Sequence, residues 1–218
     1  MMLRGLLFAG FVLAASTAWS QADPDVPQSH YVLETFQKGK VLEKSGEVHE
    51  LELNYNALTA EMIFINGGQY LAIAEPEKVD TVFIGSRVFI PGDKKFYEVL
   101  TRTPSPLLEE YTGTLKEPGS NVGYGMNSST TSATPLKSMI QGGQAYGLKL
   151  PEGYSVAAGH SFWIRVNGRL KPANSERHLN SVFPDKKAFI GQWVKEHHTN
   201  FSNSADMIAL VEALQQSS

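Results

Sequence analysis

The chain has 218 residues, with 19 Lys and Arg against 22 Asp and Glu and a formal net charge of −3. This mildly acidic balance argues against a nucleic-acid partner, which would need a basic face. The chain has no cysteine, which excludes disulfides, thiolate metal sites, cysteine nucleophiles and a lipid-modified cysteine.

The N-terminus predicts a cleavable secretory signal peptide over residues 1–20. One positive charge, Arg4, is followed by an apolar run without charged residues over 5–15 and then by small residues. This order is typical of a secretory signal. The alternative is a membrane anchor, but the run is shorter than the about 20 residues needed to span a bilayer, and no later stretch predicts a transmembrane helix.

Two cleavage sites fit the small residues. Ala18 and Ser20 suit cleavage before Gln21, and Ser20 with Ala22 suits cleavage before Asp23. Because the chain also lacks a cysteine for lipid attachment, we expect a protein of the bacterial periplasm or one secreted from the cell.

Residues 31–117 predict a β-rich zone. Apolar or ring side chains alternate with polar ones over 49–55, as in a strand with one wet face. Asn-Gly-Gly at 66–68 and Gly-Ser at 85–86 each separate two apolar runs and predict hairpins. Short strands at this spacing predict an antiparallel meander that forms a sandwich or a curled sheet.

Residues 118–135 are rich in Gly, Ser and Thr and have few apolar anchors, so they predict a loop without regular structure. A flexible linker and an ordered functional loop both remain open, since long loops inside compact domains are often functional. The Gly-Tyr-Gly at 123–125 lacks the pattern of a phosphate-binding loop.

Strands return over 136–172, and Asn167-Gly168 predicts a tight turn between two of them. Residues 173–216 predict helices, with Asn174 and Ser204 as candidate N-caps. Amphipathic helices at the end of a sheet-rich chain need a surface to cover. The mature chain, 21–218, is therefore predicted to be a single α+β domain whose C-terminal helices pack on the antiparallel sheet.

The sequence predicts no catalytic residue, because it contains neither a nucleophile elbow nor a Ser-x-x-Lys motif with its companions. His160 and Ser161 are consecutive near a strand and would point to opposite faces. A turn leading into Phe162 is the better interpretation for them. Glu109 and Glu110 follow two prolines, which indicates a solvated turn or a strand edge.

The histidines form no recognised metal motif. They stand at positions 30, 49, 160, 178, 197 and 198. His197 and His198 diverge by about 100° on a helix. His178 could approach them, but zinc needs three or four converging ligands. We therefore predict no metal and no cofactor.

Large amphipathic side chains on predicted polar faces or in loops suggest a surface for a partner, because such side chains favour interfaces. The predicted interaction surface comprises Tyr70, Tyr97, Tyr124, Met126 and Trp163. Packing of these side chains in the core is the alternative.

The chain resembles a group of uncharacterised exported proteins common in Bacteroidetes-type bacteria. The likeness is carried by NYNALTAEMIFI at 54–65, LAIA at 71–74, Pro76, VD at 79–80, Phe89, YEV at 97–99, GYG at 123–125 and FPDKK at 183–187. These motifs are loose, although they extend over nearly the whole mature chain. The resemblance implies an envelope setting and a shared fold, and it contributes no catalytic residue.

The first hypothesis for function is a non-enzymatic envelope protein that binds another envelope protein through its sheet and the loop 118–135. The alternative is a carrier of a lipid or other apolar ligand, because a curled sheet capped by helices can enclose a cavity. A second alternative is a hydrolase with an unrecognised site, since fold constrains function weakly.

Overall fold

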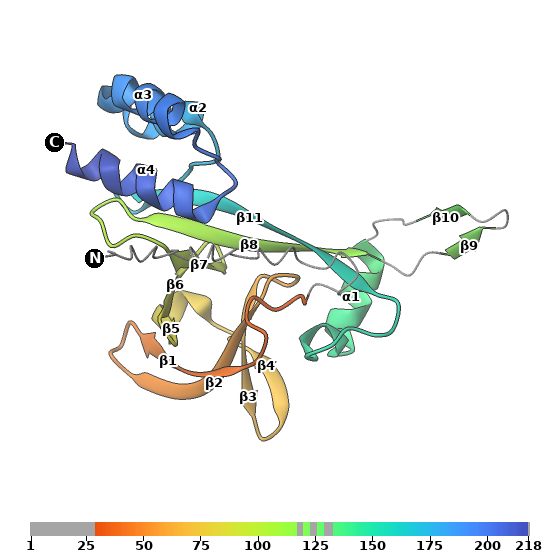
Figure 1. Cartoon of the computed structure of the whole chain (residues 1–218). Coiled ribbons are helices and arrows are strands. Elements are labelled where there is room, and N and C mark those ends of the chain that lie inside the picture. Colours follow the sequence, from red (N-terminus) through yellow and green to blue (C-terminus); the bar gives the residue numbers. More distant parts are fainter. Residues whose placement is uncertain (1–28, 117–119, 123–125, 129–132, 218) are drawn as a thin grey trace, which may run out of the picture.

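The computed structural model of the chain describes residues 29–116, 120–122, 126–128 and 133–217 (Figure 1). The predicted signal peptide lies outside these residues, so cleavage and export remain predictions. The described part combines a large antiparallel sheet with C-terminal helices packed on it. The predicted α+β class is therefore confirmed.

Within the described residues, ten strands form one antiparallel sheet in the order β12-β11-β8-β7-β6-β5-β1-β2-β3-β4. Their bounds are β1 Gln37–Glu43, β2 Val48–Asn56, β3 Glu61–Asn66, β4 Gln69–Ala72, β5 Val79–Ile84, β6 Arg87–Gly92, β7 Lys95–Val99, β8 Leu107–Lys116, β11 Ser155–Val166 and β12 Arg169–Pro172. Most neighbours in the sheet are also neighbours in the chain, as in a meander. The exceptions are the pairs β1–β5 and β8–β11.

The sheet is curled, because one apolar cluster collects side chains from strands that a flat sheet would keep apart. Val41 of β1, Met62 of β3 and Phe96 of β7 belong to this cluster, together with Tyr55 and Phe89. All five side chains are almost completely buried. The concave side of the curl is thus filled by the chain's own side chains.

Local turn chemistry places the hairpins where the sequence predicts them. Gly67 and Gly68 join β3 to β4, and Asn167 and Gly168 join β11 to β12, all four with positive φ. Glycine and asparagine tolerate this backbone region, which two-residue hairpin loops require.

The segment 118–135 contains more regular structure than predicted. Two short strands, β9 (Ser120–Val122) and β10 (Met126–Ser128), pair with each other in an antiparallel manner, and helix α1 begins at Ala133. Strand pairing is made by backbone groups, so such a polar stretch can pair without apolar anchors. The expectation of a loop without regular structure is wrong for these residues.

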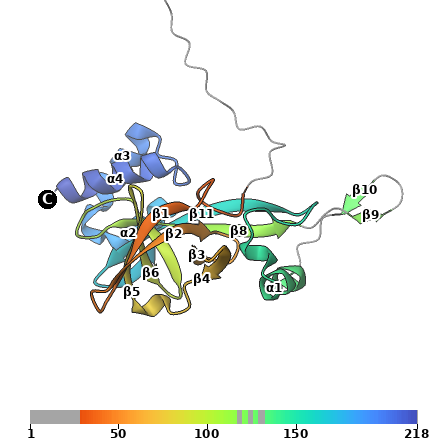
Figure 2. The same cartoon turned by 90° about the horizontal axis from the view of Figure 1, so that it is seen from below.

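Four α-helices and three 3₁₀ turns complete the described part. The bounds are α1 Ala133–Gln141, α2 Glu176–Val182, α3 Lys187–His197 and α4 Ser204–Gln216, with η1 Pro76–Lys78, η2 Gln144–Tyr146 and η3 Pro184–Lys186. Helix α2 contacts β12 and α4 contacts β8. Figures 1 and 2 show α2, α3 and α4 together at the end of the long strands β8 and β11 that is opposite to α1. None of the helices described is long and apolar enough to cross a membrane.

Two helix caps differ by one residue from the prediction. Ser175, rather than Asn174, caps α2 by accepting a hydrogen bond from the backbone N–H of His178, and Asn203, rather than Ser204, caps α4. Asn174 instead pairs with the backbone of Phe162 in β11. Asn174 therefore holds the segment that leads into α2 against the sheet, instead of capping the helix.

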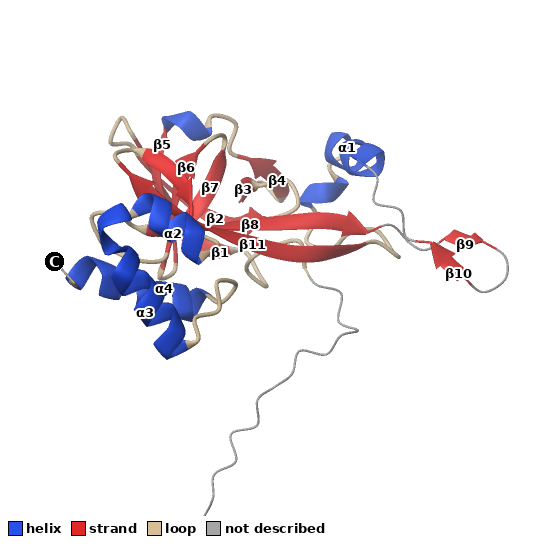
Figure 3. Cartoon of the chain, turned by 90° about the horizontal axis from the view of Figure 1, so that it is seen from above, coloured by secondary structure: helices blue, strands red, loops and turns tan. Residues whose placement is uncertain are grey.

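Two further apolar clusters flank the curled part. The larger one packs α2, α3 and α4 against β8 and β11, and its buried members are Leu107, Phe162, Ile164, Ala173, Leu179, Ile190, Met207, Leu210, Val211 and Leu214. The smaller one lies beside α1 and contains Leu58, Leu115, Met139, Ala145 and Val156. Figure 3 shows β8 and β11 running from the helical end toward α1.

Candidate functional site

Glu109 and Glu110 are adjacent in β8 and point to opposite faces of the sheet, as alternation along a strand requires. They are only 4% and 5% exposed. The prediction of a solvated turn or a strand edge is therefore wrong, because β8 is an inner strand between β7 and β11. A buried carboxylate is costly unless it is paired, so its partners decide its role.

On one face, three strands contribute a network around Tyr111. Arg87 donates two hydrogen bonds to Glu98, from Nε to Oε1 at 2.8 Å and from Nη2 to Oε2 at 2.5 Å. Its Nη2 also donates to the Tyr111 hydroxyl at 2.6 Å. That hydroxyl lies 2.7 Å from Glu98 Oε2 and 3.1 Å from Glu109 Oε2. Burial, followed by the charge of Glu98, raises the pKa of Tyr111, so the phenol remains a neutral donor.

His160 extends this network to the helices. Its Nδ1 hydrogen-bonds Glu109 Oε1, and its Nε2 lies 3.1 Å from the carbonyl oxygen of Ser202, in the loop between α3 and α4. Ser204 Oγ donates to the same Glu109 oxygen at 3.2 Å. The predicted turn at His160 is wrong, because this residue lies in the middle of β11.

These contacts do not form a nucleophilic triad. A serine nucleophile must reach the ring nitrogen that the carboxylate leaves free. Here that nitrogen of His160 faces a backbone carbonyl, and Ser204 bonds the carboxylate of Glu109 instead. The arrangement ties the α3–α4 loop and the start of α4 to β8 and β11.

A second network lies on the opposite face around Glu110. Lys95 Nζ donates to Glu110 Oε1 at 2.6 Å, and Trp163 Nε1 and Ser161 Oγ donate to Oε2 at 2.9 and 3.2 Å. The Trp163 ring packs edge-on against Tyr97, with ring centres 6.2 Å apart. Both carboxylates of β8 are therefore paired by groups from neighbouring strands, which stabilises strand pairing rather than exposing a reactive group.

The structure corrects the prediction that Tyr97 and Trp163 belong to an exposed interaction surface. Tyr97 is only 3% exposed, and burial together with the charge of Glu110 raises its pKa to about 12. Trp163 is half-buried and its indole N–H is occupied by Glu110. Tyr124 lies outside the described residues, and Met126 lies in β10 with its side chain outside the described part.

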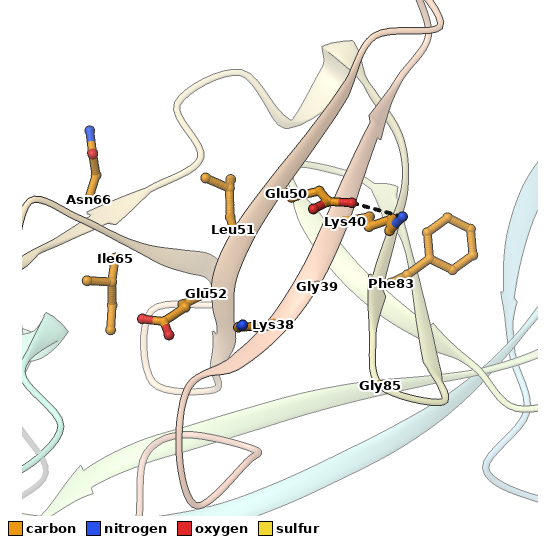
Figure 4. Close-up of a pocket in the computed structure, with 10 residues that line it drawn as sticks. All are labelled: Lys38, Gly39, Lys40, Glu50, Leu51, Glu52, Ile65, Asn66, Phe83 and Gly85. Atoms are coloured by element: carbon orange, nitrogen blue, oxygen red, sulfur yellow. Dashed lines mark ion pairs between the residues drawn. The ribbon is translucent and has the colours of Figure 1, made fainter.

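An open groove lies instead on the strands that α2, α3 and α4 leave uncovered. It has a volume of about 670 Å³. It is lined by Lys38, Gly39, Lys40, Glu50, Leu51, Glu52, Ile65, Asn66, Phe83 and Gly85 (Figure 4). These residues come from β1, β2, β3 and the β5–β6 hairpin, and we call this surface the groove face.

Cross-strand charge pairs form the floor of the groove face. Lys38 lies opposite Glu52 and Lys40 lies opposite Glu50 in the β1–β2 register. The Lys40 Nζ and Glu50 Oε1 atoms are 3.0 Å apart, and both side chains are largely exposed. Between the two lysines, a Cβ on Gly39 would lie 2.3 Å from the carbonyl oxygen of Phe83. Glycine therefore permits the close approach of β1 and β5 here.

Phe83 supplies the exposed aromatic side chain of the groove face. It is 39% exposed, and Figure 4 shows its ring pointing away from the β1–β2 ribbon. Ile65 lies at the opposite end of the groove and pairs across β3–β4 with Tyr70, which therefore shares its face. The Tyr70 ring packs on the Phe36 ring, with ring centres 5.3 Å apart. Of the predicted interaction residues, Tyr70 is the one that the register places beside the groove.

A second groove of about 560 Å³ runs between residues 29–34 and the loop 148–155. Leu148, Leu150 and Tyr154 are among its lining residues, so its wall is largely apolar. His30 also lines it and is 2% exposed, and burial lowers the pKa of this histidine.

Among the described residues, His178, His197 and His198 do not form a group with the spacing of metal ligands. In the part of the chain that the structure describes, one group of three candidate ligand atoms has such spacing, and it consists of Glu43, Glu47 and His49. This group lies at the turn between β1 and β2.

Phe83 is not among the residues of the predicted interaction surface, although the sequence contains a signal for its exposure. Val82 and Ile84 are buried on both sides of it in β5. Since alternate residues of a strand share a face, Phe83 must point the other way. Val82, Phe83 and Ile84 are all apolar and suit a core, so composition alone does not distinguish the exposed Phe83 from its two buried neighbours.

No protein-family model matches the chain, and the comparisons with curated proteins and with solved structures found no match.

Proposed function

We propose that the chain is an exported, non-enzymatic binding protein whose partner is another protein of the cell envelope. The proposed docking surface is the groove face, and the observation that carries the proposal is exposed Phe83 beside the charge pairs of β1 and β2. Aromatic side chains, phenylalanine included, are enriched at protein interfaces. Charged pairs around it favour one partner and one orientation.

The charge pattern indicates what kind of partner segment fits. Lysines from β1 and glutamates from β2 form parallel rows of opposite sign. A complementary surface would carry acidic groups over Lys38 and Lys40, basic groups over Glu50 and Glu52, and an apolar side chain against Phe83. The predicted signal peptide and the absence of a cysteine for lipid attachment support an envelope setting for this partner.

Site-specific photo-cross-linking tests the proposal. A photoreactive phenylalanine analogue at position 83 should form a cross-link to one protein in an envelope extract. The matched control is the same analogue at Val48, which is 51% exposed at the start of β2 and does not line the groove. Equal cross-linking from both positions would refute a specific docking surface.

A charge exchange provides the second arm of the test. In Lys40→Glu/Glu50→Lys the ion pair within the chain is kept while the pattern offered to the partner is reversed. The fold should be retained and the cross-link from position 83 should be lost. Retention of the cross-link would contradict the role of the charge rows. Deletion of residues 118–135 tests separately whether this loop contributes to partner binding.

The alternative, a carrier of an apolar ligand, is supported by the apolar wall of the second groove. The concave side of the curled sheet does not provide the ligand cavity, because the side chains of Tyr55, Phe89 and Phe96 fill it. Native mass spectrometry of gently purified protein tests the alternative, which predicts a co-purifying ligand that is released by Leu150→Asp. For the hydrolase alternative, the networks around Glu109 and Glu110 supply no free base or nucleophile.

A further inference from the structure

The hairpin between β1 and β2 brings three potential metal ligands together. Glu43 ends β1, and Glu47 stands directly before β2. The Glu43 N–H donates to the Glu47 carbonyl at 2.8 Å, and the N–H of Gly46 donates to the Glu43 carbonyl at 2.9 Å. Gly46 has φ of 91°, a conformation that favours glycine. The turn therefore fixes the two glutamates on either side of it.

His49 lies two residues beyond Glu47 and thus on the same side of the chain. Its Nε2 is 3.0 Å from Glu43 Oε1 and 3.7 Å from Glu47 Oε1. All three ligand atoms lie within 4.8 Å of one another. Ligand atoms at about 2.0–2.1 Å from one tetrahedral ion are separated by about 3.3 Å. The two separations that involve His49 bracket that value, and the separation between the two glutamates is at most 4.8 Å, so side-chain rotations would complete such a site.

Neighbouring groups orient the ligands. Ser45 Oγ donates to Glu43 Oε2 at 3.2 Å, which leaves Oε1 directed at His49. The ammonium group of Lys44 is bound to the backbone carbonyl of Glu77 at 2.8 Å. The three ligand side chains are 30–66% exposed, so an ion can enter from solvent and keep water as a further ligand.

We infer that Glu43, Glu47 and His49 bind one divalent transition-metal ion, with Zn²⁺ as the representative. Imidazole nitrogen and carboxylate oxygen together suit zinc, copper and nickel. Calcium and magnesium prefer six or more oxygen ligands, and two carboxylates with one imidazole do not provide them. The ion would also neutralise two carboxylates that the hairpin holds close together. An ion pair between His49 and Glu43 alone would not require Glu47 to converge on the same nitrogen. The inference is independent of the proposed docking function.

Isothermal titration calorimetry with Zn²⁺ on chelator-treated protein tests the site. We expect one ion per chain and a rise in the melting temperature on binding, because a ligand of the folded state stabilises it. His49→Ala and Glu47→Gln should each weaken binding by about tenfold or more. Ser45→Ala should weaken it less, as expected for a group that orients a ligand. Co²⁺ bound in place of Zn²⁺ should show the visible absorption of a tetrahedral site.

Matched controls separate this site from general surface binding. His198→Asn and Glu212→Gln remove exposed potential ligands elsewhere and should leave Zn²⁺ affinity unchanged. The melting temperature of each variant without metal establishes that it is folded. Equal affinity of the wild type and His49→Ala, or equal losses in the control variants, would overturn the inference. Ca²⁺ binding that depends on the two glutamates but not on His49 would also overturn it.

Discussion

Replacement of Arg87 by alanine tests whether the network around Tyr111 holds the sheet together. The Arg87 side chain is 26% exposed and that of Glu98 is 10% exposed, so the substitution leaves a nearly buried carboxylate without its cation. Removing one partner of a buried ion pair costs about 3–5 kcal/mol. Because Arg87 is partly exposed, we expect the lower end, about 3 kcal/mol, which is a large share of a stability of about 5–15 kcal/mol.

The charge of Glu98 is the expected cause of this loss, and a second substitution isolates it. In Arg87→Ala/Glu98→Gln the uncompensated charge is absent, while the amide oxygen can still accept from Tyr111. The double variant should therefore be more stable than Arg87→Ala alone. Lys40→Ala, which removes an exposed ion pair with Glu50, should cost at most about 1 kcal/mol.

Urea unfolding followed by far-UV circular dichroism measures these differences as shifts of the midpoint at constant slope. If Glu98→Gln lowers the stability of Arg87→Ala further, the reasoning is refuted. In that case the arginine would stabilise the sheet through packing over the ring of Phe89, 5.7 Å from its guanidinium carbon, rather than through its charge.

Two other substitutions have defined outcomes. Burial lowers the pKa of His30 from its usual 6.5, so the unfolded chain binds more protons at this site, and the unfolding free energy should fall as the pH drops below about 6.5. His30→Asn should flatten that decline in urea titrations across this range, and an equally steep decline would contradict the assignment. Gly39→Ala places a Cβ 2.3 Å from the Phe83 carbonyl and 2.9 Å from Leu53 Cδ1, so it should cost about 1–3 kcal/mol through overpacking. An unchanged urea midpoint would show that β1 and β5 can separate freely.

The parts of the fold that depend on local chemistry could be predicted from the sequence. The turn at Asn167-Gly168 follows from two residues that tolerate positive φ. The apolar stripes of α3 and α4 follow from helical spacing and include buried Ile190 and Met207. In each of these cases the residues that decide the structure are close together in the chain.

The burial of Glu109 and Glu110 could not be predicted in this way. Their partners His160 and Trp163 lie more than 50 residues further along the chain, and Lys95 lies in another strand. The burial of Tyr97 could not be predicted either, because alternation separates the two faces of a strand but does not tell which face is covered.

The candidate metal site, by contrast, has a signal that the sequence contains. Glu47 and His49 are two residues apart at the start of a predicted strand, and Gly46 marks the turn before it. The third ligand, Glu43, becomes visible only when the turn is recognised as a hairpin. Histidine motifs alone do not reveal this group, because two of its three ligands are glutamates.

Strand β8 contacts all three apolar clusters. Leu107 lies in the helical cluster, Tyr111 packs against the cluster of the curled sheet, and Leu115 lies in the cluster beside α1. These residues are four apart and so share one face of the strand. None of the three clusters can open fully without disturbing the same strand. The backbone amides of β8 should therefore exchange with solvent only when the whole domain unfolds, which makes the helical end, the curl and α1 one cooperative unit.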